Sequence, residues 1–163
     1  GLLTVAEALD LFPTVRFNID VKTAAAAEPL GPILAEHTHR TLVTSFTDVH
    51  RRATVAAVLR SGAALRPATS GGSRTIAAVR ALSALRLSPT RALRDIDALQ
   101  VPERQGPLTV LTAALIRAAH AHGVEVHVWT VNNSASMRRL VALGVDGIVT
   151  DRADFAIDTL PPS

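Results

Sequence analysis

The sequence predicts an α/β protein in which parallel strands are connected by helices. Short runs of β-branched and other apolar residues alternate along the chain with longer runs of helical periodicity. Strict alternation of this kind is typical of parallel strands joined by crossover helices. The chain has 163 residues, of which 48% are hydrophobic and 19% charged, so it can bury a core and is not intrinsically disordered.

The expected strands are six short segments bounded by turn residues. They are Val15–Lys22, Thr41–Phe46, Ala63–Arg66, Ala98–Val101, Glu125–Val131 and Gly147–Thr150. The stretch Pro67–Ser73 contains two adjacent glycines and is expected to be a loop.

The expected helices lie between these strands. They are Val5–Leu11, Pro29–Thr38, Asp48–Ser61, Ser73–Leu87, Thr109–His122 and Ser134–Leu143. Thr4 and Glu7 have the spacing of a capping box at the start of the first helix. Gly123 and Gly144 each follow a helix at a position where a left-handed C-terminal cap is expected.

Two architectures fit this alternation, an open doubly wound sheet and a (β/α) barrel. A complete barrel of eight units needs about 250 residues, whereas this chain has about six units. Neither a Gly-x-Gly-x-x-Gly fingerprint nor a P-loop lysine motif is present, which argues against a nucleotide-binding open sheet.

The segment Val15–Lys22 has one apolar and one polar face, because side chains alternate across a strand. The apolar face carries Val15, Phe17, Ile19 and Val21, and the polar face carries Arg16, Asn18, Asp20 and Lys22. A parallel strand covered on both faces would be apolar throughout. In a barrel, the C-terminal end of the inner face lines the mouth where active sites lie, so Asp20 and Lys22 are candidate site residues. A solvated edge strand or a structural ion pair would give the same pattern.

Trp129 is the only tryptophan and shares a strand face with His127 and Val131. A tryptophan in the core is the commoner explanation of such a position, and a tryptophan that forms a wall of a substrate pocket is the alternative. The segment Gly144–Asp151 predicts a tight turn into a short buried strand that ends in two polar residues.

Taken together, these segments resemble the bacterial glycerophosphodiester phosphodiesterases. The resemblance is carried, in the order of the family's strand motifs, by Asn18–Lys22, Thr44–Phe46, Ala98–Pro102, Val126–Asn132 and Gly144–Asp151. It implies a (β/α)8 TIM barrel that is incomplete here, lacking its first strands, with residues 1–163 as the C-terminal part of a single domain. It also implies metal-dependent hydrolysis of glycerophosphodiesters to glycerol 3-phosphate and an alcohol, with calcium or magnesium as the divalent cation.

The same resemblance assigns roles to five residues. Asp20 occupies a metal-ligand position, where the family usually has the glutamate of a Glu-x-Lys motif. Aspartate keeps the oxygen ligand that hard cations prefer, with a shorter reach. Lys22 matches the motif lysine, whose ammonium group faces the substrate phosphate. Phe46 and Trp129 match aromatic positions near the substrate pocket, and Gln100 matches its polar lining.

The acid–base histidines of the family and two of its metal-binding acids have no counterpart in this chain. In the family they belong to a His-Arg motif on the first strand, a Glu-x-Asp motif on the second and a loop that follows. All of these precede the segments matched here. The six histidines of the chain are expected to have ordinary surface or packing roles. We therefore expect the 163-residue chain alone to be inactive. The alternative is a non-catalytic barrel fragment that binds a phosphate ester or a partner.

Composition narrows the partners that the sequence predicts. The basic residues are scattered and tyrosine is absent, which argues against nucleic-acid binding. No apolar run is long enough to cross a bilayer, and no signal peptide is evident. The family resemblance implies a role in lipid and glycerol metabolism, and we expect a cytoplasmic location. Open barrel edges would favour self-association.

Overall fold

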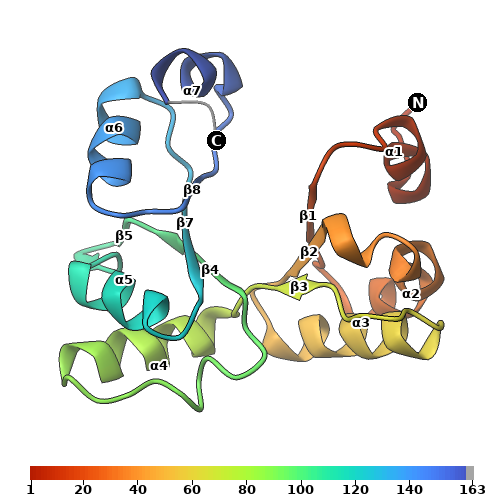
Figure 1. Ribbon diagram of the computed structural model, residues 1–163, viewed down its shortest axis with the longest axis horizontal. Helices are drawn as coiled ribbons and strands as arrows, with labels where there is room; N and C mark the ends of the chain where they lie inside the picture. Colours follow the sequence, from red (N-terminus) through yellow and green to blue (C-terminus); the bar gives the residue numbers. More distant parts are fainter. Residues whose placement is uncertain (161–163) are drawn as a thin grey trace. The chain divides into compact units, whose positions relative to one another are not determined.

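The computed structural model describes residues 1–160 and has the predicted alternation of strands and helices (Figure 1). The chain divides into two compact units, Gly1–Arg74 and the residues from Thr75 onward. Each unit contains a three-stranded sheet in which all the strand pairs are parallel.

In the first unit, most of the helices and strands lie at or near the positions predicted for them. Its elements are α1 (Val5–Leu11), β1 (Phe17–Asp20), the 3-10 turn η1 (Ala24–Ala26), α2 (Ala27–Ala35), the 3-10 turn η2 (Thr38–Arg40), β2 (Thr41–Thr44), α3 (Asp48–Arg60) and β3 (Ala68–Thr69). The strand order is β1-β2-β3. In the β1–β2 register Asp20 lies opposite Thr44, so the C-terminal ends of these two strands are level.

The second unit begins within α4 (Ser73–Ala84), whose first two residues belong to the first unit. Its further elements are β4 (Ala98–Pro102), the hairpin strands β5 (Arg104–Gln105) and β6 (Leu108–Thr109), α5 (Ala113–His120), β7 (Glu125–Trp129), α6 (Ser134–Ala142), β8 (Gly147–Ile148) and α7 (Ala153–Thr159). The order of the main sheet is β4-β7-β8.

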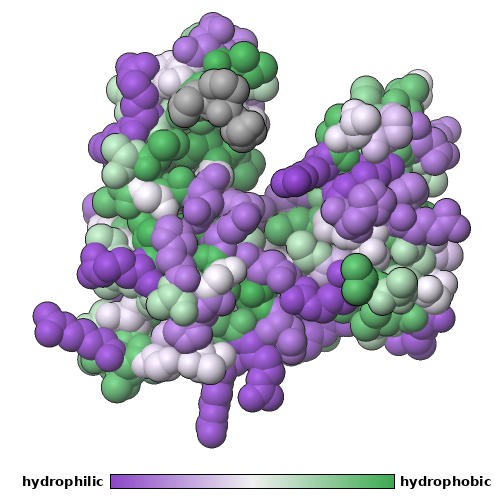
Figure 2. Space-filling view, in the orientation of Figure 1, coloured by the Kyte–Doolittle hydropathy of each residue, from purple (hydrophilic) through white to green (hydrophobic). Residues whose placement is uncertain are grey.

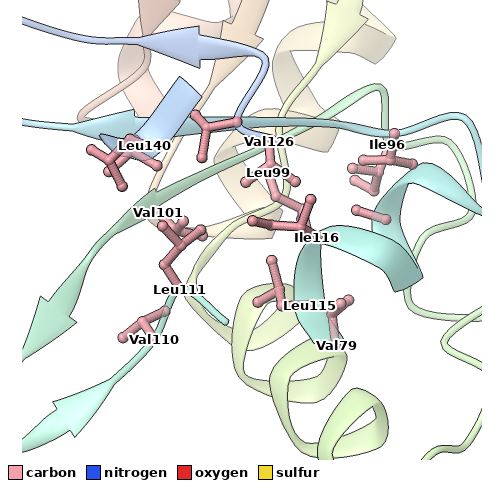
Figure 3. Packing of buried hydrophobic residues seen from close by; sticks show 14 of the residues in the cluster. Val79, Ile96, Leu99, Val101, Val110, Leu111, Leu115, Ile116, Val126 and Leu140 are labelled. Atoms are coloured by element: carbon pink, nitrogen blue, oxygen red, sulfur yellow. The ribbon is translucent and has the colours of Figure 1, made fainter. Parts of the chain in front are cut away.

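Each unit has its own hydrophobic core. In the first unit, Leu9 of α1, Leu34 of α2 and Val58 of α3 pack with Val43 of β2 and Val21. The core of the second unit gathers residues of β4 and β7 against α5 and α6, and Figure 3 shows several of them close together. Because strand residues alternate, burial of one face of β4 and β7 leaves the next residues, Gln100, His127 and Trp129, on the opposite face.

Several helix boundaries have the local causes that the sequence predicts. The capping box of α1 is confirmed, since Thr4 and Glu7 exchange hydrogen bonds across the first turn. Gly123 and Gly144 have φ angles of +68° and +97°, the left-handed region in which glycine avoids a Cβ clash.

One predicted strand and the start of one predicted helix are wrong. The segment Ala63–Arg66 was expected to be a strand, but the strand β3 is Ala68–Thr69, inside the expected loop. The backbone of Ala68 and Thr69 aligns with Leu42 and Val43 of β2, and the ladder continues because Ser70 N donates to Val43 O. The apolar run ahead of it, which suggested the strand, leaves Leu65 exposed.

The helix expected from Thr109 begins later. Leu108 and Thr109 pair instead with Arg104 and Gln105 in a small antiparallel hairpin. The helix α5 then begins after Thr112, whose hydroxyl accepts a hydrogen bond from Leu115 N and so caps it.

Val131 does not share a face with Trp129, contrary to the prediction. The strand β7 ends at Trp129, so the alternation stops there. Val131 instead joins the buried cluster that contains Val126 and Val128. The helix α7 and the β5–β6 hairpin were not expected from the sequence.

The surface carries exposed hydrophobic side chains in both units. On the face drawn in Figure 2, hydrophobic residues are interspersed with hydrophilic ones over both units. The large exposed side chains include Leu11, Phe12, Leu65, Leu85, Leu87 and Ile157. Within residues 1–160, no helix combines the length and the apolar character that crossing a bilayer requires.

Candidate functional site

The first unit brings together three of the five predicted site residues. Asp20 is the last residue of β1, Lys22 follows it by two positions, and Phe46 follows β2. The Lys22 Nζ atom donates a hydrogen bond to Asp20 Oδ2. The same Nζ atom lies 5.0 Å from the centroid of the Phe46 ring, within cation–π range. The lysine ammonium group is therefore held between a carboxylate and an aromatic ring, and we call these three residues the lysine cluster.

The side chains of the lysine cluster are exposed to solvent. The side chains of Lys22 and Asp20 are 67% and 35% exposed. An ion pair this accessible to water contributes about 0–1 kcal/mol to stability. The alternative interpretation of Asp20 and Lys22 as a structural ion pair therefore explains little of the fold's stability. The side chains of the lysine cluster are accessible to a ligand.

The strand ends that carry the lysine cluster are fixed by buried hydrogen bonds. The backbone of Val21 donates to Thr44 O, and the buried Ser45 hydroxyl donates to Val21 O at 2.8 Å. Ser45 also accepts from Thr47 N, which turns the chain into α3. These contacts hold the segment after β1 against the segment after β2, so Lys22 and Phe46 meet.

The loop after β3 supports Phe46 from the other side. Ser73 N donates to Phe46 O at 3.0 Å, and Gly72 N donates to Asp48 Oδ1 at 3.1 Å. A Cβ atom on Gly72 would lie 2.9 Å from both Phe46 O and Asp48 N, so only glycine allows this approach. The backbone of Phe46 is therefore clamped, while 58% of the residue's surface is exposed.

The remaining two predicted site residues, Gln100 and Trp129, belong to the second unit. They lie on the same face of β4 and β7, opposite the buried valines. Trp129 is half-buried and lies outside the hydrophobic core, so its position is not that of a core tryptophan. The core explanation is therefore wrong, and a pocket-wall role for Trp129 stays a prediction.

Two residues that were not among the predicted site residues, Glu125 and His127, join Gln100 on this face. His127 Nδ1 lies 3.3 Å from Gln100 Nε2, and His127 Nε2 lies 2.9 Å from Glu125 Oε2. The spacing of Glu125, His127 and Trp129 at alternate positions of one strand was a signal for a shared face. Contact with Gln100 depends on the pairing of β4 with β7, which the sequence did not reveal.

Asn132 connects the segment that follows β7 with the segment that follows β8. Its Oδ1 atom accepts hydrogen bonds from Asp151 N at 2.9 Å and from the Thr150 hydroxyl at 3.0 Å, and its Nδ2 atom donates to Asp151 Oδ2. The ends of β7 and β8 are thereby held together. Asn132 has a structural role that was not expected from the sequence.

The described residues fit part of a divalent-cation site. Asp20 supplies one carboxylate, and Asn18 precedes it on the same face of β1. Calcium takes six to eight oxygen ligands, and within residues 1–160 no three His, Asp or Glu side chains are grouped as a metal would need. A cation at Asp20 would compete with Lys22 for the carboxylate and would need further oxygen ligands.

Comparison with known proteins identifies the family. The model of the Glycerophosphoryl diester phosphodiesterase family matches residues 2–155, so the chain belongs to this family and the predicted resemblance is confirmed. A Mycobacterium tuberculosis protein named "Probable glycerophosphodiester phosphodiesterase 2" is 38% identical over 162 residues, which cover 96% of this chain and 59% of that protein.

Solved structures confirm the predicted fold class, an incomplete (β/α) barrel of the phosphodiesterase type. A glycerophosphodiester phosphodiesterase from Parabacteroides distasonis matches with a TM-score of 0.62 at 17% identity, over 94% of this chain and 61% of that one. A phosphodiesterase from Oleispira antarctica, solved in complex with the product sn-glycerol-3-phosphate, matches with a TM-score of 0.61 at 14% identity, over 94% of this chain and 60% of that one. The chain thus spans about three-fifths of the length of these relatives.

Proposed function

We propose that the full-length protein hydrolyses glycerophosphodiesters to glycerol 3-phosphate and an alcohol. The observation that carries the proposal is the lysine cluster, which holds an ammonium group at the ends of two adjacent parallel strands in a chain of this family. The complex of the Oleispira relative with sn-glycerol-3-phosphate supports a small-molecule substrate of this class.

In this proposal Lys22 stabilises the negative charge that develops on the phosphoryl group. A fixed cation aimed at developing charge lowers the barrier without reorganising in the reaction. Asp20 and Phe46 orient the ammonium group, since one accepts its hydrogen bond and the other lies beside it. Gln100 and Trp129 remain predicted substrate-binding residues. Proton transfer to the leaving alkoxide is assigned to family histidines that this sequence lacks.

The proposed cofactor is a calcium or magnesium ion with Asp20 among its ligands. Such an ion would polarise a phosphoryl oxygen. If Asp20 is a ligand, the change Asp20→Glu should restore the longer reach that is usual in the family and lower the metal concentration needed for half-maximal activity. The change Asp20→Asn should raise that concentration. An unchanged metal requirement in both variants, with weaker substrate binding, would instead make Asp20 only the partner of Lys22.

The second candidate is a non-catalytic barrel that binds a phosphate ester or a protein partner. It is favoured by the exposed ammonium group of the lysine cluster, which could bind an anionic ester without any acid–base group. In this case the full-length protein would bind sn-glycerol 3-phosphate without releasing it from any diester.

One experiment separates the two candidates. The full-length protein and the 163-residue chain are each incubated with glycerophosphodiesters that differ in the leaving alcohol, with calcium, magnesium or a chelator. Released glycerol 3-phosphate is then measured. We expect metal-dependent turnover by the full-length protein and none by the 163-residue chain, because the chain lacks both acid–base histidines. Robust turnover by the shorter chain would contradict this assignment of the catalytic groups.

The cellular setting is also a proposal. A hydrolase of deacylated phospholipids would act in lipid and glycerol metabolism, and we expect it in the cytoplasm. Fractionation of cells that express the tagged full-length protein tests the location.

A further inference from the structure

Two buried charged residues follow Phe46 in the first unit and have no part in the function proposed above. Asp48 is the first residue of α3, and Arg51 follows it by one turn. Their side chains are only 12% and 7% exposed, and Arg51 Nη2 lies 3.4 Å from Asp48 Oδ1. Arg51 Nη1 also donates to the hydroxyl group of Thr69 on β3 at 3.3 Å. A carboxylate and a guanidinium group are thus enclosed between α3 and β3.

A buried ion pair of this kind adds little to stability by itself. Removing two charges from water costs about as much as their attraction returns, so an apolar pair of similar size would serve the fold as well. The distance of 3.4 Å also exceeds the usual length of a charge-assisted hydrogen bond, about 2.7–2.9 Å, which weakens the attraction further. Stability alone therefore does not explain why a carboxylate is buried at this position.

Asp48 also holds the loop that follows β3. Its Oδ1 atom accepts a hydrogen bond from Gly72 N at 3.1 Å, and its Oδ2 atom would lie 3.0 Å from a Cβ atom on Gly72. Gly72 is buried. The same loop holds Phe46, because Ser73 N donates to Phe46 O at 3.0 Å. The Asp48 carboxylate therefore acts on Phe46 through a loop that lies more than twenty residues further along the chain.

The position of the Phe46 backbone determines where the ring lies relative to Lys22. Phe46 is 58% exposed, so the packing of neighbouring side chains restrains its ring only in part. Lys22 Nζ lies 5.0 Å from the ring centroid, and a cation–π attraction requires a distance within about 6 Å. A displacement of Phe46 by about 1 Å is therefore enough to release the ammonium group from the ring.

We propose that Asp48 is a positioning residue, which places the ring of Phe46 against the ammonium group of Lys22 by holding the loop after β3. The inference rests on the proposed function, because it concerns the cation that meets the substrate phosphate. It has two consequences. Asp48 affects ligand binding only through Phe46, and the acceptor oxygen of Asp48 matters for binding whereas its negative charge does not. A role confined to the stability of the fold would have neither consequence.

The test is a double-mutant cycle in the full-length protein. Binding of sn-glycerol 3-phosphate is measured by calorimetric titration at a fixed calcium concentration. Asp48→Ala and Phe46→Leu should each weaken binding about fourfold, the scale of one exposed cation–π contact. The double variant should also lose about fourfold, whereas independent effects would multiply to about sixteenfold. A sixteenfold loss, or no loss from Asp48→Ala alone, would overturn the inference.

Two further variants separate binding from stability. Asp48→Asn keeps an oxygen that accepts from Gly72 N, so its affinity should stay within about twofold of the unmodified protein. Its melting temperature should fall, because the negative charge beside Arg51 is lost. Thr69→Val is the matched control, since it removes a partner of Arg51 and keeps the hydrogen bonds of Gly72 and Ser73. It should lower the melting temperature and leave affinity unchanged. Affinity that falls in step with melting temperature across all the variants would make Asp48 merely structural.

Asp48→Ser keeps the inference testable if Asp48→Ala fails to fold. Serine is well tolerated at the start of a helix, and its hydroxyl group is too short to reach Gly72 N. The same fourfold loss is expected for Asp48→Ser, alone and combined with Phe46→Leu, and a sixteenfold loss in the combination would overturn the inference. If the unmodified protein binds glycerol 3-phosphate and the cycle is non-additive, but no diester is hydrolysed, the inference stands and the proposed hydrolysis fails. Absence of binding by the unmodified protein would overturn both proposals.

Discussion

Lys22 is held at the end of β1 by a carboxylate on one side and an aromatic ring on the other. Both contacts are exposed, so they contribute little to stability, and their value lies in orienting the ammonium group. Lys22 is also the single lysine of a chain whose other basic side chains, apart from histidine, are all arginine. A lysine presents a compact charge to a phosphate, whereas arginine presents a wider planar fork.

The first prediction concerns the charge of Lys22. In the full-length protein, Lys22→Met should lower kcat by about 100-fold, the usual effect of removing one group that stabilises developing charge. Lys22→Arg should recover part of this loss because the charge is kept.

Phe46→Leu should weaken substrate binding by only a few-fold, in line with a cation–π contribution of about 0.5–1 kcal/mol. Thermal melts of all three should match that of the unmodified protein, and a large drop in melting temperature would contradict an orienting role.

Arg40 shows the opposite behaviour, a charged residue with a structural role. Its guanidinium group is buried and donates to three backbone oxygens, those of Leu9, Phe12 and Val15, at 2.7 to 3.1 Å. It also lies 5.5 Å from the centroid of the Phe17 ring. The C-terminal end of α1 and the segment that leads into β1 are therefore tied to the start of β2.

The second prediction is that Arg40→Ala destabilises the chain by about 3 kcal/mol, since it removes the donor of the buried Leu9 carbonyl oxygen and of two partly buried ones. Arg40→Lys should recover little, because an ammonium group cannot reproduce the planar set of donors. Arg52→Ala, which removes an exposed arginine of α3, is the matched control and should change the urea midpoint little. Similar midpoints for Arg40→Ala and Arg52→Ala would contradict the structural role.

At the scale of elements, α1 depends on a local interaction at its N-terminus. Hydrogen bonds from the Thr4 backbone, and next from the Thr4 hydroxyl, lower the pKa of the Glu7 carboxyl. A carboxyl group with a lowered pKa in the folded state stabilises the fold most when it is ionised. Its contribution is fully present above the ordinary glutamate pKa of about 4.3 and is lost as the pH falls through the lowered value.

The third prediction follows from the lowered pKa of the Glu7 carboxyl group. At pH 7, Glu7→Ala should have a lower urea midpoint than the unmodified chain, and the difference should shrink as the pH falls below about 4. Asp10→Ala, which removes an exposed carboxylate from the other end of the same helix, should not show this dependence. A pH-independent difference for Glu7→Ala would mean that the carboxylate does not act through the capping box.

The two-residue alternation of apolar and polar side chains correctly predicts which face of β1 is buried. The apolar face of β1 packs in the core of the first unit through Phe17 and Ile19, and the next residue in the alternation, Val21, is fully buried there. The opposite face, with Asn18 and Asp20, is exposed. This division follows from the two-residue period of a strand. The two-residue strand β3 is too short to have such a signature, which is why its position was predicted wrongly.

At the scale of the whole molecule, each sheet has open edges within the part of the chain that the structure describes. β1 and β3 each have a single strand neighbour in the first sheet, and so do β4 and β8 in the second. Unpaired strand edges can pair with another chain. The exposed hydrophobic side chains near α1, among them Phe12 and Val15, would reinforce such pairing.

The fourth prediction is that the 163-residue chain self-associates at micromolar concentration. Sedimentation should reveal dimers or larger species, and a hydrophobic dye should bind. Val15→Lys, which places a charge just before β1, should reduce association because charged side chains protect edge strands. A monomer with a cooperative melt and no dye binding would contradict the prediction, as would association that Val15→Lys leaves unchanged.

Much of the fold and part of the site could be predicted because they depend on neighbours in the chain. Strand alternation placed Asn18 and Asp20 on one face, the Thr4–Glu7 spacing marked a helix start, and Gly123 marked a helix end. Each of these features involves residues at most a few positions apart. Local sterics and hydrogen bonding therefore specify them before any tertiary contact forms.

The tertiary structure decided which distant side chains meet. Phe46 reaches Lys22 because β1 and β2 end at the same level, and Gln100 reaches His127 because β4 pairs with a strand that follows it by more than twenty residues. Gly147 faces the His127 ring only through the pairing of β7 with β8. Register between strands depends on the packing of whole sheets and helices, so no local pattern in the sequence reveals these contacts.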